Sequence, residues 1–262
     1  MSDKKQVIVI TGATSGIGLS TALLLVKEGF TVYGVARKAR ELPFPCISCD
    51  VTDAAAFSSA LAAVYEKEGR IDALINNAGM GISGAAEYIS EADSQRLFAV
   101  NTLAALSSAR AAIPYLKETQ GKLLFTSSVA AVIPIPFQAA YSSSKAAINY
   151  YALSLREEIK PFKIKVSVVM PGDTKTGFTD ARVKTETEEG YASRVSKSVG
   201  RMEKDERGGK DPATVARVFL KLLKSKNPPP LVTVGFGYKL IVFLKRLLPQ
   251  RLIQWVVSKL YA

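Results

Sequence analysis

The sequence predicts an α/β protein with a parallel sheet covered by helices on both faces, and three observations point to that fold class. Short apolar runs alternate with longer segments of helical periodicity, as repeated strand–helix units require. The runs are apolar throughout, which is typical of strands buried on both faces. The chain has 262 residues, a length that one domain of this class can reach.

Seven apolar runs are predicted to form the strands of this sheet. They are residues 7–10, 31–36, 46–50, 71–76, 122–127, 165–170 and 231–234. Helices are predicted between them at 16–28, 54–68, 92–117, 140–160 and 211–224. Gly29 should end the first helix, because glycine readily adopts the left-handed conformation that follows many helices. Asp211 and Pro212 should begin the last one, as a capping residue and a first-turn proline.

The composition excludes several kinds of protein. The chain has no histidine, so proton transfer near neutral pH must depend on Tyr, Lys, Cys or a carboxylate. The net charge of +12 and the isoelectric point of about 9.6 favour polyanionic partners, meaning nucleic acid, an anionic membrane or a phosphorylated ligand. We expect no nucleic-acid partner, because no motif of interleaved aromatic and basic residues accompanies the charge.

The cysteines and the apolar runs bear on the compartment of the protein. Cys46 and Cys49 form one CxxC pair, which lacks the second pair of a zinc site. A redox role is the alternative, and two buried or half-buried thiols in a reducing cytosol is the interpretation we favour. Only four apolar residues follow residues 1–6, too few for a signal peptide, and no uninterrupted run approaches the ~18 of a membrane span. We therefore expect a cytoplasmic protein without a metal site.

Tyr141 and Lys145 form the most informative pair in the chain. Residues four apart share one face of a helix, so the phenol and the ammonium group can act at one site. A neighbouring cation favours phenolate and should lower the pKa of Tyr141 from about 10 toward neutral pH. The pair is thus predicted to be an acid/base catalyst, although the spacing alone also occurs in ordinary amphipathic helices.

Further motifs accompany this pair in a fixed order. Residues 11–18 read Thr-Gly-Ala-Thr-Ser-Gly-Ile-Gly, and residues 76–79 read Asn-Asn-Ala-Gly. Ser128 lies 13 residues before Tyr141, and Pro171 is followed by Gly172. In these motifs the chain resembles the short-chain dehydrogenase/reductase family over residues 6 to about 235. The resemblance implies a Rossmann-type, doubly wound parallel sheet in a single domain, residues 1–237, that binds a nicotinamide dinucleotide.

The glycine-rich loop is predicted to place the pyrophosphate of that dinucleotide at a helix N-terminus. Its glycines permit a tight turn and a close approach of the backbone. The cofactor residues in this loop are Gly12, Thr14, Ser15, Gly16, Ile17 and Gly18. The resemblance adds Asp50, Val51, Asn77, Ala78, Gly79, Tyr141, Lys145, Pro171, Gly172, Thr174 and Thr176. Thr174 stands where the family commonly has Val or Ile.

The end of the second predicted strand indicates which dinucleotide is used. An acid at this position usually binds the ribose 2′-hydroxyl of NAD, whereas an Arg accommodates the 2′-phosphate of NADP. The chain has Arg37 and Lys38 there and no acid. We therefore predict NADP(H) as the cofactor, the alternative being that Arg37 is simply a solvated strand end.

The resemblance also implies the catalytic residues. Ser128 and Tyr141 would hold a ketone or alcohol, Tyr141 would transfer the proton, and Lys145 would lower the pKa of Tyr141 and hold the nicotinamide ribose. Asn101 falls at the family's fourth catalytic position, where it holds a water that connects the lysine to solvent. Ser127 competes with Ser128, and a packed polar residue is the alternative for Asn101.

Two segments after Gly172 are individual to this chain. Residues 173–210 combine nine Lys and Arg with eight Asp and Glu and show little apolar periodicity, which suggests a mobile insertion that forms a lid over the site. Residues 238–262 combine apolar residues, Trp255 and basic residues without an acid. This tail fits an amphipathic helix on an anionic membrane, or two short helices, broken at Pro249, that close the substrate pocket or contact another subunit.

Apolar residues in the substrate segments predict a hydrophobic ketone or secondary alcohol as the substrate. These residues are Met80, Ile82, Val132, Ile133, Ile135, Phe137 and Phe178. The leading hypothesis is an NADP(H)-dependent hydroxysteroid dehydrogenase, for a steroid or bile acid, or a lipid ketone reductase. The alternatives are a 3-oxoacyl-[acyl-carrier-protein] reductase and a non-catalytic NADPH-binding protein on a membrane. The resemblance also implies a homodimer or homotetramer built on the helices at 92–117 and 140–160.

Overall fold

The computed structural model describes residues 5–186 and 188–261. Residues 1–4, on which the cytoplasmic expectation partly rests, lie outside the described residues, as do residue 187 of the predicted insertion and residue 262 of the tail.

A seven-stranded sheet with the strand order β3-β2-β1-β4-β6-β7-β9 forms the centre of the molecule, and every pair of neighbours is parallel. The strands are β1 (Val7–Thr11), β2 (Thr31–Ala36), β3 (Cys46–Ser48), β4 (Ala73–Asn76), β6 (Lys122–Thr126), β7 (Lys165–Met170) and β9 (Leu231–Thr233). The strand order reverses direction between β1 and β4, which opens a crevice at the carboxyl ends of the strands. The predicted doubly wound fold is confirmed.

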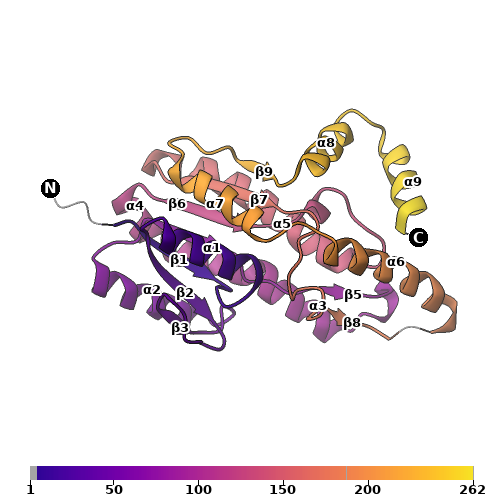
Figure 1. Ribbon diagram of the computed structural model, residues 1–262, viewed down its shortest axis with the longest axis horizontal. Helices are drawn as coiled ribbons and strands as arrows, with labels where there is room; N and C mark the ends of the chain where they lie inside the picture. Colours follow the sequence, from indigo (N-terminus) through magenta and orange to yellow (C-terminus); the bar gives the residue numbers. More distant parts are fainter. Residues whose placement is uncertain (1–4, 187, 262) are drawn as a thin grey trace.

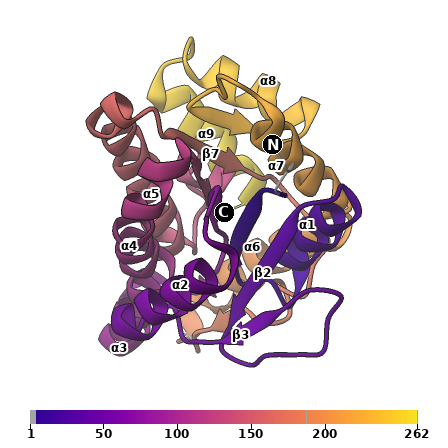
Figure 2. The ribbon, with the colours of Figure 1, turned by 90° about the vertical axis from the view of Figure 1, so that its left-hand side faces the viewer.

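Helices cover both faces of the sheet (Figure 2). On one face, α1 (Gly16–Lys27) packs beside α7 (Ala213–Lys224). On the other face lie α2 (Ala54–Glu68), α4 (Ala104–Thr119) and α5 (Ala139–Glu158). Parallel strands need such crossover helices, and the strands are buried on both faces as their composition predicts.

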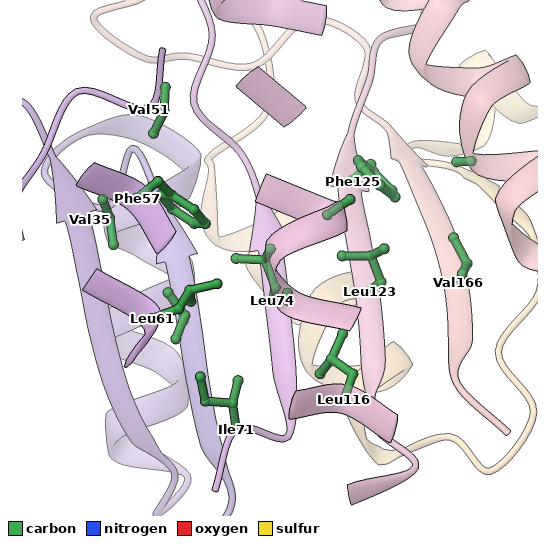
Figure 3. Close-up of a cluster of buried hydrophobic side chains, with 14 of the residues drawn as sticks. Val35, Val51, Phe57, Leu61, Ile71, Leu74, Leu116, Leu123, Phe125 and Val166 are labelled. Carbon is green, nitrogen blue, oxygen red and sulfur yellow. The ribbon is translucent and has the colours of Figure 1, made fainter. Parts of the chain in front are cut away.

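The apolar core beneath α2, α4 and α5 holds the sheet in register. Phe57 and Leu61 of α2 and Leu116 of α4 meet Leu74 and Leu123 of the sheet, and all five side chains are buried (Figure 3). Burial of one such side chain contributes about 1.5–3 kcal/mol to stability. This face therefore fixes the strand ends that carry the functional residues.

Two predicted strands are each shorter than expected by two residues. β3 ends at Ser48 instead of residue 50, and β4 begins at Ala73 instead of residue 71. The Asp50 side chain accepts hydrogen bonds from the backbone and the hydroxyl of Thr52, a local turn that replaces strand pairing. Cys46 is half-buried and Cys49 is buried, and both are free thiols, as predicted.

The long helix predicted at 92–117 is interrupted in its middle. It consists of α3 (Glu91–Phe98), a π-helical turn at Ala99–Leu103 and α4. Taken together, these three parts span Glu91–Thr119, and by length and composition this segment is apolar enough to cross a membrane. Its apolar residues Leu97, Ala109, Ala112 and Leu116 are buried in the core, so they do not indicate a membrane span.

The charged insertion is more regular than predicted, because α6 (Glu189–Arg207) occupies half of it. Only Ser198, Val199 and Met202 of this helix are buried, too few for a recognisable apolar stripe. Ion pairs at helical spacing, such as Arg201 with Asp205 at 2.8 Å, support its exposed face. A second pairing joins β5 (Ile82–Ser83) to β8 (Val183–Lys184).

The tail forms two short helices separated at Pro249, namely α8 (Phe236–Lys245) and α9 (Gln250–Tyr261). They lie at the end of the molecule that carries α6 (Figure 1). Ile253 and Val257 are buried, and α9 packs against α6. Of the alternatives for the tail, the pair of helices near the lid is the one that the structure contains.

Candidate active site

Helix α5 places Tyr141 and Lys145 one turn apart at the carboxyl ends of the strands. Ser128 follows β6 and precedes a short 3₁₀-helix, Val129–Ala131, and its hydroxyl interacts with that of Tyr141. The Tyr141 ring packs against Phe178 of the insertion, with 5.8 Å between the ring centroids. Tyr141, Ser128 and Lys145 all line one cavity.

Ser127 and Ser128 differ in what their hydroxyl groups bind. The Ser127 hydroxyl donates to the backbone carbonyl of Lys145 at 3.0 Å and is buried. The Ser128 hydroxyl accepts a hydrogen bond from the backbone N–H of Ala130 at 3.1 Å, and its proton can face Tyr141. This geometry favours Ser128 over Ser127 as the residue that holds the substrate oxygen.

Asn101 lies in the π-helical turn, a feature often found at functional sites. Its side chain is paired with both backbone groups of Met80, at 2.8 and 2.9 Å, and it donates to the Ser144 hydroxyl at 3.0 Å. A Cβ at Gly79 would lie 3.2 Å from both Asn101 Oδ1 and Lys145 Nζ. Asn101 thus lies beside Lys145, and Gly79 leaves the space between them. The role of Asn101 in holding a water stays a prediction.

The pKa of Tyr141 is raised to about 12, mainly because burial destabilises the phenolate. The hydrogen bond with Ser128 and the charge of Arg182 lower the pKa, and Glu206 raises it further. We expected Lys145 to lower this pKa, and the net shift is in the opposite direction. The phenol is therefore protonated at neutral pH, which is the state that donates a proton.

Lys145 is buried and donates a hydrogen bond to the carbonyl of Thr126 at 3.2 Å. Burial lowers its pKa to about 8, because water no longer stabilises the ammonium ion. Burial, and not the charge of Lys145, determines the shift of the Tyr141 pKa.

The glycine-rich loop has the shape that a pyrophosphate requires. Gly12 has a φ of +68°, and a Cβ there would lie 3.0 Å from Ala78 Cα. A Cβ at Gly18 would strike the carbonyl of Gly12. In the described part of the chain, the Ser15 side chain forms no capping bond to α1, so the first N–H groups of α1 remain available for an anion. These residues fit the predicted dinucleotide.

The loop that contains Asn77 is hydrogen-bonded to the ends of neighbouring strands beside the glycine-rich loop. The backbone N–H of Asn77 donates to the Thr11 hydroxyl at 2.9 Å, and its side-chain amide donates to the Thr11 carbonyl at 3.1 Å. The side-chain oxygen of Asn77 accepts from the Thr126 hydroxyl at 3.1 Å. Ala78 donates to the same Thr11 hydroxyl at 3.0 Å. Thr11 is a residue that the sequence analysis did not assign to the site, although it opens the glycine motif.

Arg37 is exposed at the carboxyl end of β2 and lines the same depression as the glycine loop. The positive charges of Arg37 and Arg96 help to lower the pKa of Asp50, after the larger effect of the backbone hydrogen bond from Thr52. The guanidinium of Arg37 therefore acts electrostatically on the carboxylate of Asp50.

A cavity of about 700 Å³ joins these groups to the tail. Most of the predicted residues line it, namely Gly12, Ser15, Gly16, Ile17, Arg37, Asn77, Ala78, Gly79, Ser128, Tyr141, Lys145, Pro171, Gly172, Thr174 and Thr176. Thr14, Gly18, Asp50, Val51 and Asn101 are not part of its wall. Of the predicted substrate residues, Ile133, Ile135 and Phe178 line it, and Met80, Ile82, Val132 and Phe137 do not.

The tail, for which closure of the substrate pocket is one of the predictions, contributes apolar residues to the cavity wall. They come from α8, α9 and the segment between them, namely Ile241, Leu244, Leu248, Leu252, Ile253, Val256, Val257 and Leu260. Asp173, Glu206 and Tyr238 add polar groups. The acid after Pro171-Gly172 was a usable signal for Asp173, whereas Glu206 is one charge among many in the insertion. The site is an apolar cavity with a proton donor at one end and a dinucleotide cradle beside it.

A parallel doubly wound sheet, a glycine cradle and a Ser–Tyr–Lys centre define an oxidoreductase of carbonyl and hydroxyl groups that uses a nicotinamide dinucleotide. Residues 6–187 match the family model described as short chain dehydrogenase. The chain belongs to the short-chain dehydrogenase family. Its predicted use of a nicotinamide cofactor is thereby confirmed, and the non-catalytic alternative is not supported.

Several characterised relatives act on lipids. The chain is 38% identical to the 3-ketodihydrosphingosine reductase of Bacteroides thetaiotaomicron, over 98% of both chains. It is 32% identical to the NADPH-dependent 1-acyldihydroxyacetone phosphate reductase of Saccharomyces cerevisiae, over 71% of this chain and 67% of the relative. Among solved structures, a short-chain dehydrogenase from Streptomyces avermitilis matches with a TM-score of 0.83 and 30% identity, covering 91% of this chain and 92% of the other.

Proposed function

We propose that the protein reduces the ketone of a long-chain lipid, 3-ketodihydrosphingosine or a close analogue, with NADPH as the hydride donor. The observation that carries the proposal is the cavity, whose wall includes Tyr141 and, on the side of the tail, apolar residues of α8 and α9. These tail residues are called the roof of the cavity. Such an apolar wall would exclude a long acyl chain from water. The full-length similarity to a 3-ketodihydrosphingosine reductase supports the same substrate.

In the proposed reaction the bound dinucleotide supplies hydride to the carbonyl carbon. Ser128 orients the ketone oxygen by a hydrogen bond, and Tyr141 donates its proton to that oxygen as negative charge develops. The high pKa of Tyr141 keeps the phenol protonated at neutral pH, which suits the direction of reduction. Lys145 would bind the nicotinamide ribose and return a proton toward Tyr141, with Asn101 holding the connecting water.

The test is a substrate panel with purified protein, following NADPH and NADH oxidation. The panel contains 3-ketodihydrosphingosine, 1-acyldihydroxyacetone phosphate, 3-, 7-, 12- and 17-ketosteroids, bile-acid ketones and a 3-oxoacyl thioester. We expect the highest kcat/KM for 3-ketodihydrosphingosine with NADPH. A preference for a ketosteroid would instead establish the hydroxysteroid dehydrogenase, and a preference for the thioester would establish the 3-oxoacyl-[acyl-carrier-protein] reductase.

The preference for NADPH is proposed to depend on Arg37. Arg37→Glu should lower kcat/KM for NADPH roughly 10- to 100-fold, because one charged hydrogen bond contributes about 1.5–3 kcal/mol, and it should raise kcat/KM for NADH. Lys38→Glu makes the same charge change at an exposed neighbour outside the cavity wall. Equal losses in the two variants would show that net charge, not a contact from Arg37, sets the preference.

We also propose that the outer face of the tail contacts an anionic membrane. Phe236, Leu240, Phe243, Leu247 and Trp255 are 49–81% exposed and do not line the cavity. The first four recur at helical spacing, and Lys239 and Arg246 lie along one edge of their stripe. An exposed apolar stripe with basic neighbours is typical of a helix that lies on anionic lipid. The protein would then act at the cytoplasmic surface of a membrane.

Sedimentation with vesicles containing anionic lipid tests this contact. The triple variant Leu240→Gln, Phe243→Gln and Leu247→Gln should bind several-fold less than the unaltered protein, and added salt should weaken binding. Ile241→Gln, on the cavity side of α8, is the matched control and should bind normally. If the triple variant sedimented like the unaltered protein, or changed only its oligomeric state, the stripe would not be a membrane contact.

The subunit contact of the expected homo-oligomer is proposed to lie on α4 and α5. Tyr150 on α5 is 75% exposed, and Leu103, immediately before α4, is 60% exposed. Large apolar groups that are this exposed commonly mark protein contacts. This surface is separate from the outer face of α8, so one assembly can use both.

A further inference from the structure

Two acids lie in the wall of a cavity that is otherwise largely apolar on its tail side. Asp173 follows Pro171 and Gly172 after β7, and Glu206 is near the end of α6. Both line the same cavity as Tyr141, and the charge of Glu206 acts on the Tyr141 phenol. Charged groups in an apolar cavity are costly unless they are paired, so their partners indicate what the cavity can bind.

The carboxylate of Glu206 is fully engaged by the protein. One oxygen is paired with Arg182, whose side chain is buried, and the other accepts a hydrogen bond from the Thr179 hydroxyl at 2.7 Å. The nearby Asp205 is likewise paired with Arg201 at 2.8 Å. Arg182 and Arg201 therefore form their ion pairs with acids of α6.

Asp173 forms no ion pair with the described residues, although the charge of Arg182 lowers the pKa of its carboxyl. Its Oδ2 accepts a hydrogen bond from the Tyr238 hydroxyl, and no side chain of the described residues bonds to its Oδ1. Burial raises the pKa of its carboxyl, and the charges of Asp205 and Glu206 raise it further. A cation that entered the cavity would stabilise the ionised form, because an opposite charge within hydrogen-bonding distance favours it.

The backbone holds Asp173 firmly in place. Its carbonyl accepts a hydrogen bond from Lys210 at 3.0 Å, and a Cβ at Gly209 would lie 2.5 Å from its carbonyl carbon. The ring of Tyr238 covers Gly172, where a Cβ would collide with it. The carboxylate is thus held where the end of β7, the insertion and α8 meet, in the wall of the cavity that Tyr141 also lines.

We propose that Asp173 binds a primary ammonium group on the carbon next to the reacting carbonyl, and so selects long-chain 2-amino ketones over uncharged and anionic ketones. The inference rests on the proposed function, because 3-ketodihydrosphingosine carries an ammonium group at that carbon. The ammonium would donate to Asp173 Oδ1 while the ketone oxygen faces Ser128 and Tyr141. Lys245 also lines the cavity. It would repel a cation only beside α8 and α9, where the uncharged hydrocarbon chain of the substrate would lie.

Selectivity between two ketones that differ only in the amine tests the proposal. The probes are 3-ketodihydrosphingosine and 1-hydroxyoctadecan-3-one, each reduced with NADPH. In Asp173→Asn the ratio of kcat/KM for the amino ketone to kcat/KM for the amine-free ketone should fall about 10- to 100-fold, the range for one charged hydrogen bond. Tyr238→Phe removes the other partner of the carboxylate and keeps its charge, so the ratio should stay within about threefold.

Two outcomes would overturn the inference. One is an unchanged ratio in Asp173→Asn, and the other is an unaltered protein that reduces the amine-free ketone or 1-acyldihydroxyacetone phosphate more efficiently than the amino ketone. If no long-chain ketone is reduced, the proposed function fails, and calorimetric binding of the long-chain amine sphinganine in the presence of NADP⁺ still tests Asp173. Binding that is equally tight in Asp173→Asn would reject the ammonium site.

Discussion

Replacing Tyr141 by phenylalanine is expected to lower kcat/KM for ketone reduction on the order of 10³-fold, since a positioned general acid typically contributes 10²–10⁴-fold. The phenol is the proposed proton donor, and it lies beside Ser128 in the wall of the cavity. Phenylalanine preserves the ring that packs against Phe178, so the fold and the cofactor cradle should remain intact. The measurement is the initial rate of NADPH oxidation with the ketone identified by the substrate panel.

The matched control for this variant lies on the same helix. Tyr150→Phe removes a hydroxyl from α5 at a residue that is 75% exposed, and it should leave the rate unchanged. Quenching of protein fluorescence by NADPH should be the same in both variants. A Tyr141→Phe protein with more than a tenth of the original kcat/KM would mean that another group, or water, supplies the proton.

Removing the roof of the cavity is expected to lower kcat/KM for an 18-carbon ketone on the order of 10²-fold. Deletion of residues 236–262 exposes the chain of the substrate to water, and each methylene that loses burial costs about 0.8 kcal/mol. Four uncovered methylenes are enough for this effect. A short ketone, which ends below the roof, should lose much less, and the comparison of the two chain lengths is the measurement.

Deletion also exposes apolar side chains of the lid, so point variants accompany it. Ile241→Gln with Leu248→Gln places two amides in the cavity wall, whereas Leu240→Gln with Phe243→Gln places them on the outer face of α8. Only the first pair should reduce the preference for the longer ketone. Equal effects of the two pairs would show that α8 acts through stability and not through contact with the substrate.

The tail differs from a simple lid because the two faces of α8 have different surroundings. Tyr238, Ile241, Lys245 and Leu248 line the cavity, while Leu240 and its outward neighbours remain exposed. If the outer face lies on a membrane, as proposed, a lipid ketone has a short path from the bilayer to Tyr141. The vesicle experiment and the chain-length experiment test the two faces separately, because the substitutions on one face serve as the control for the other.

The succession of strands and helices along the chain, the glycine-rich loop and the Tyr141–Lys145 pair were predictable from the sequence, and the family resemblance added Ser128. The reason is that these features are local: buried strands have an apolar composition, a helix aligns residues four apart, and a glycine turn needs residues without a Cβ. The parallel pairing then brings the carboxyl ends of the strands to one edge. Local patterns therefore determined both the fold class and most of the cofactor and catalytic residues.

The raised pKa of Tyr141, the helix within the insertion and the tail residues that line the cavity were decided only by the tertiary structure. The pKa depends on burial beneath segments that are far away in sequence. Helix α6 has too few buried residues for a visible stripe, because only Ser198, Val199 and Met202 meet the core. α8 is apolar on two faces, and its sequence does not reveal which one faces the cavity. Asp173 acquires its setting in the same way, since its partner Tyr238 is 65 residues away, and only folding brings the two together.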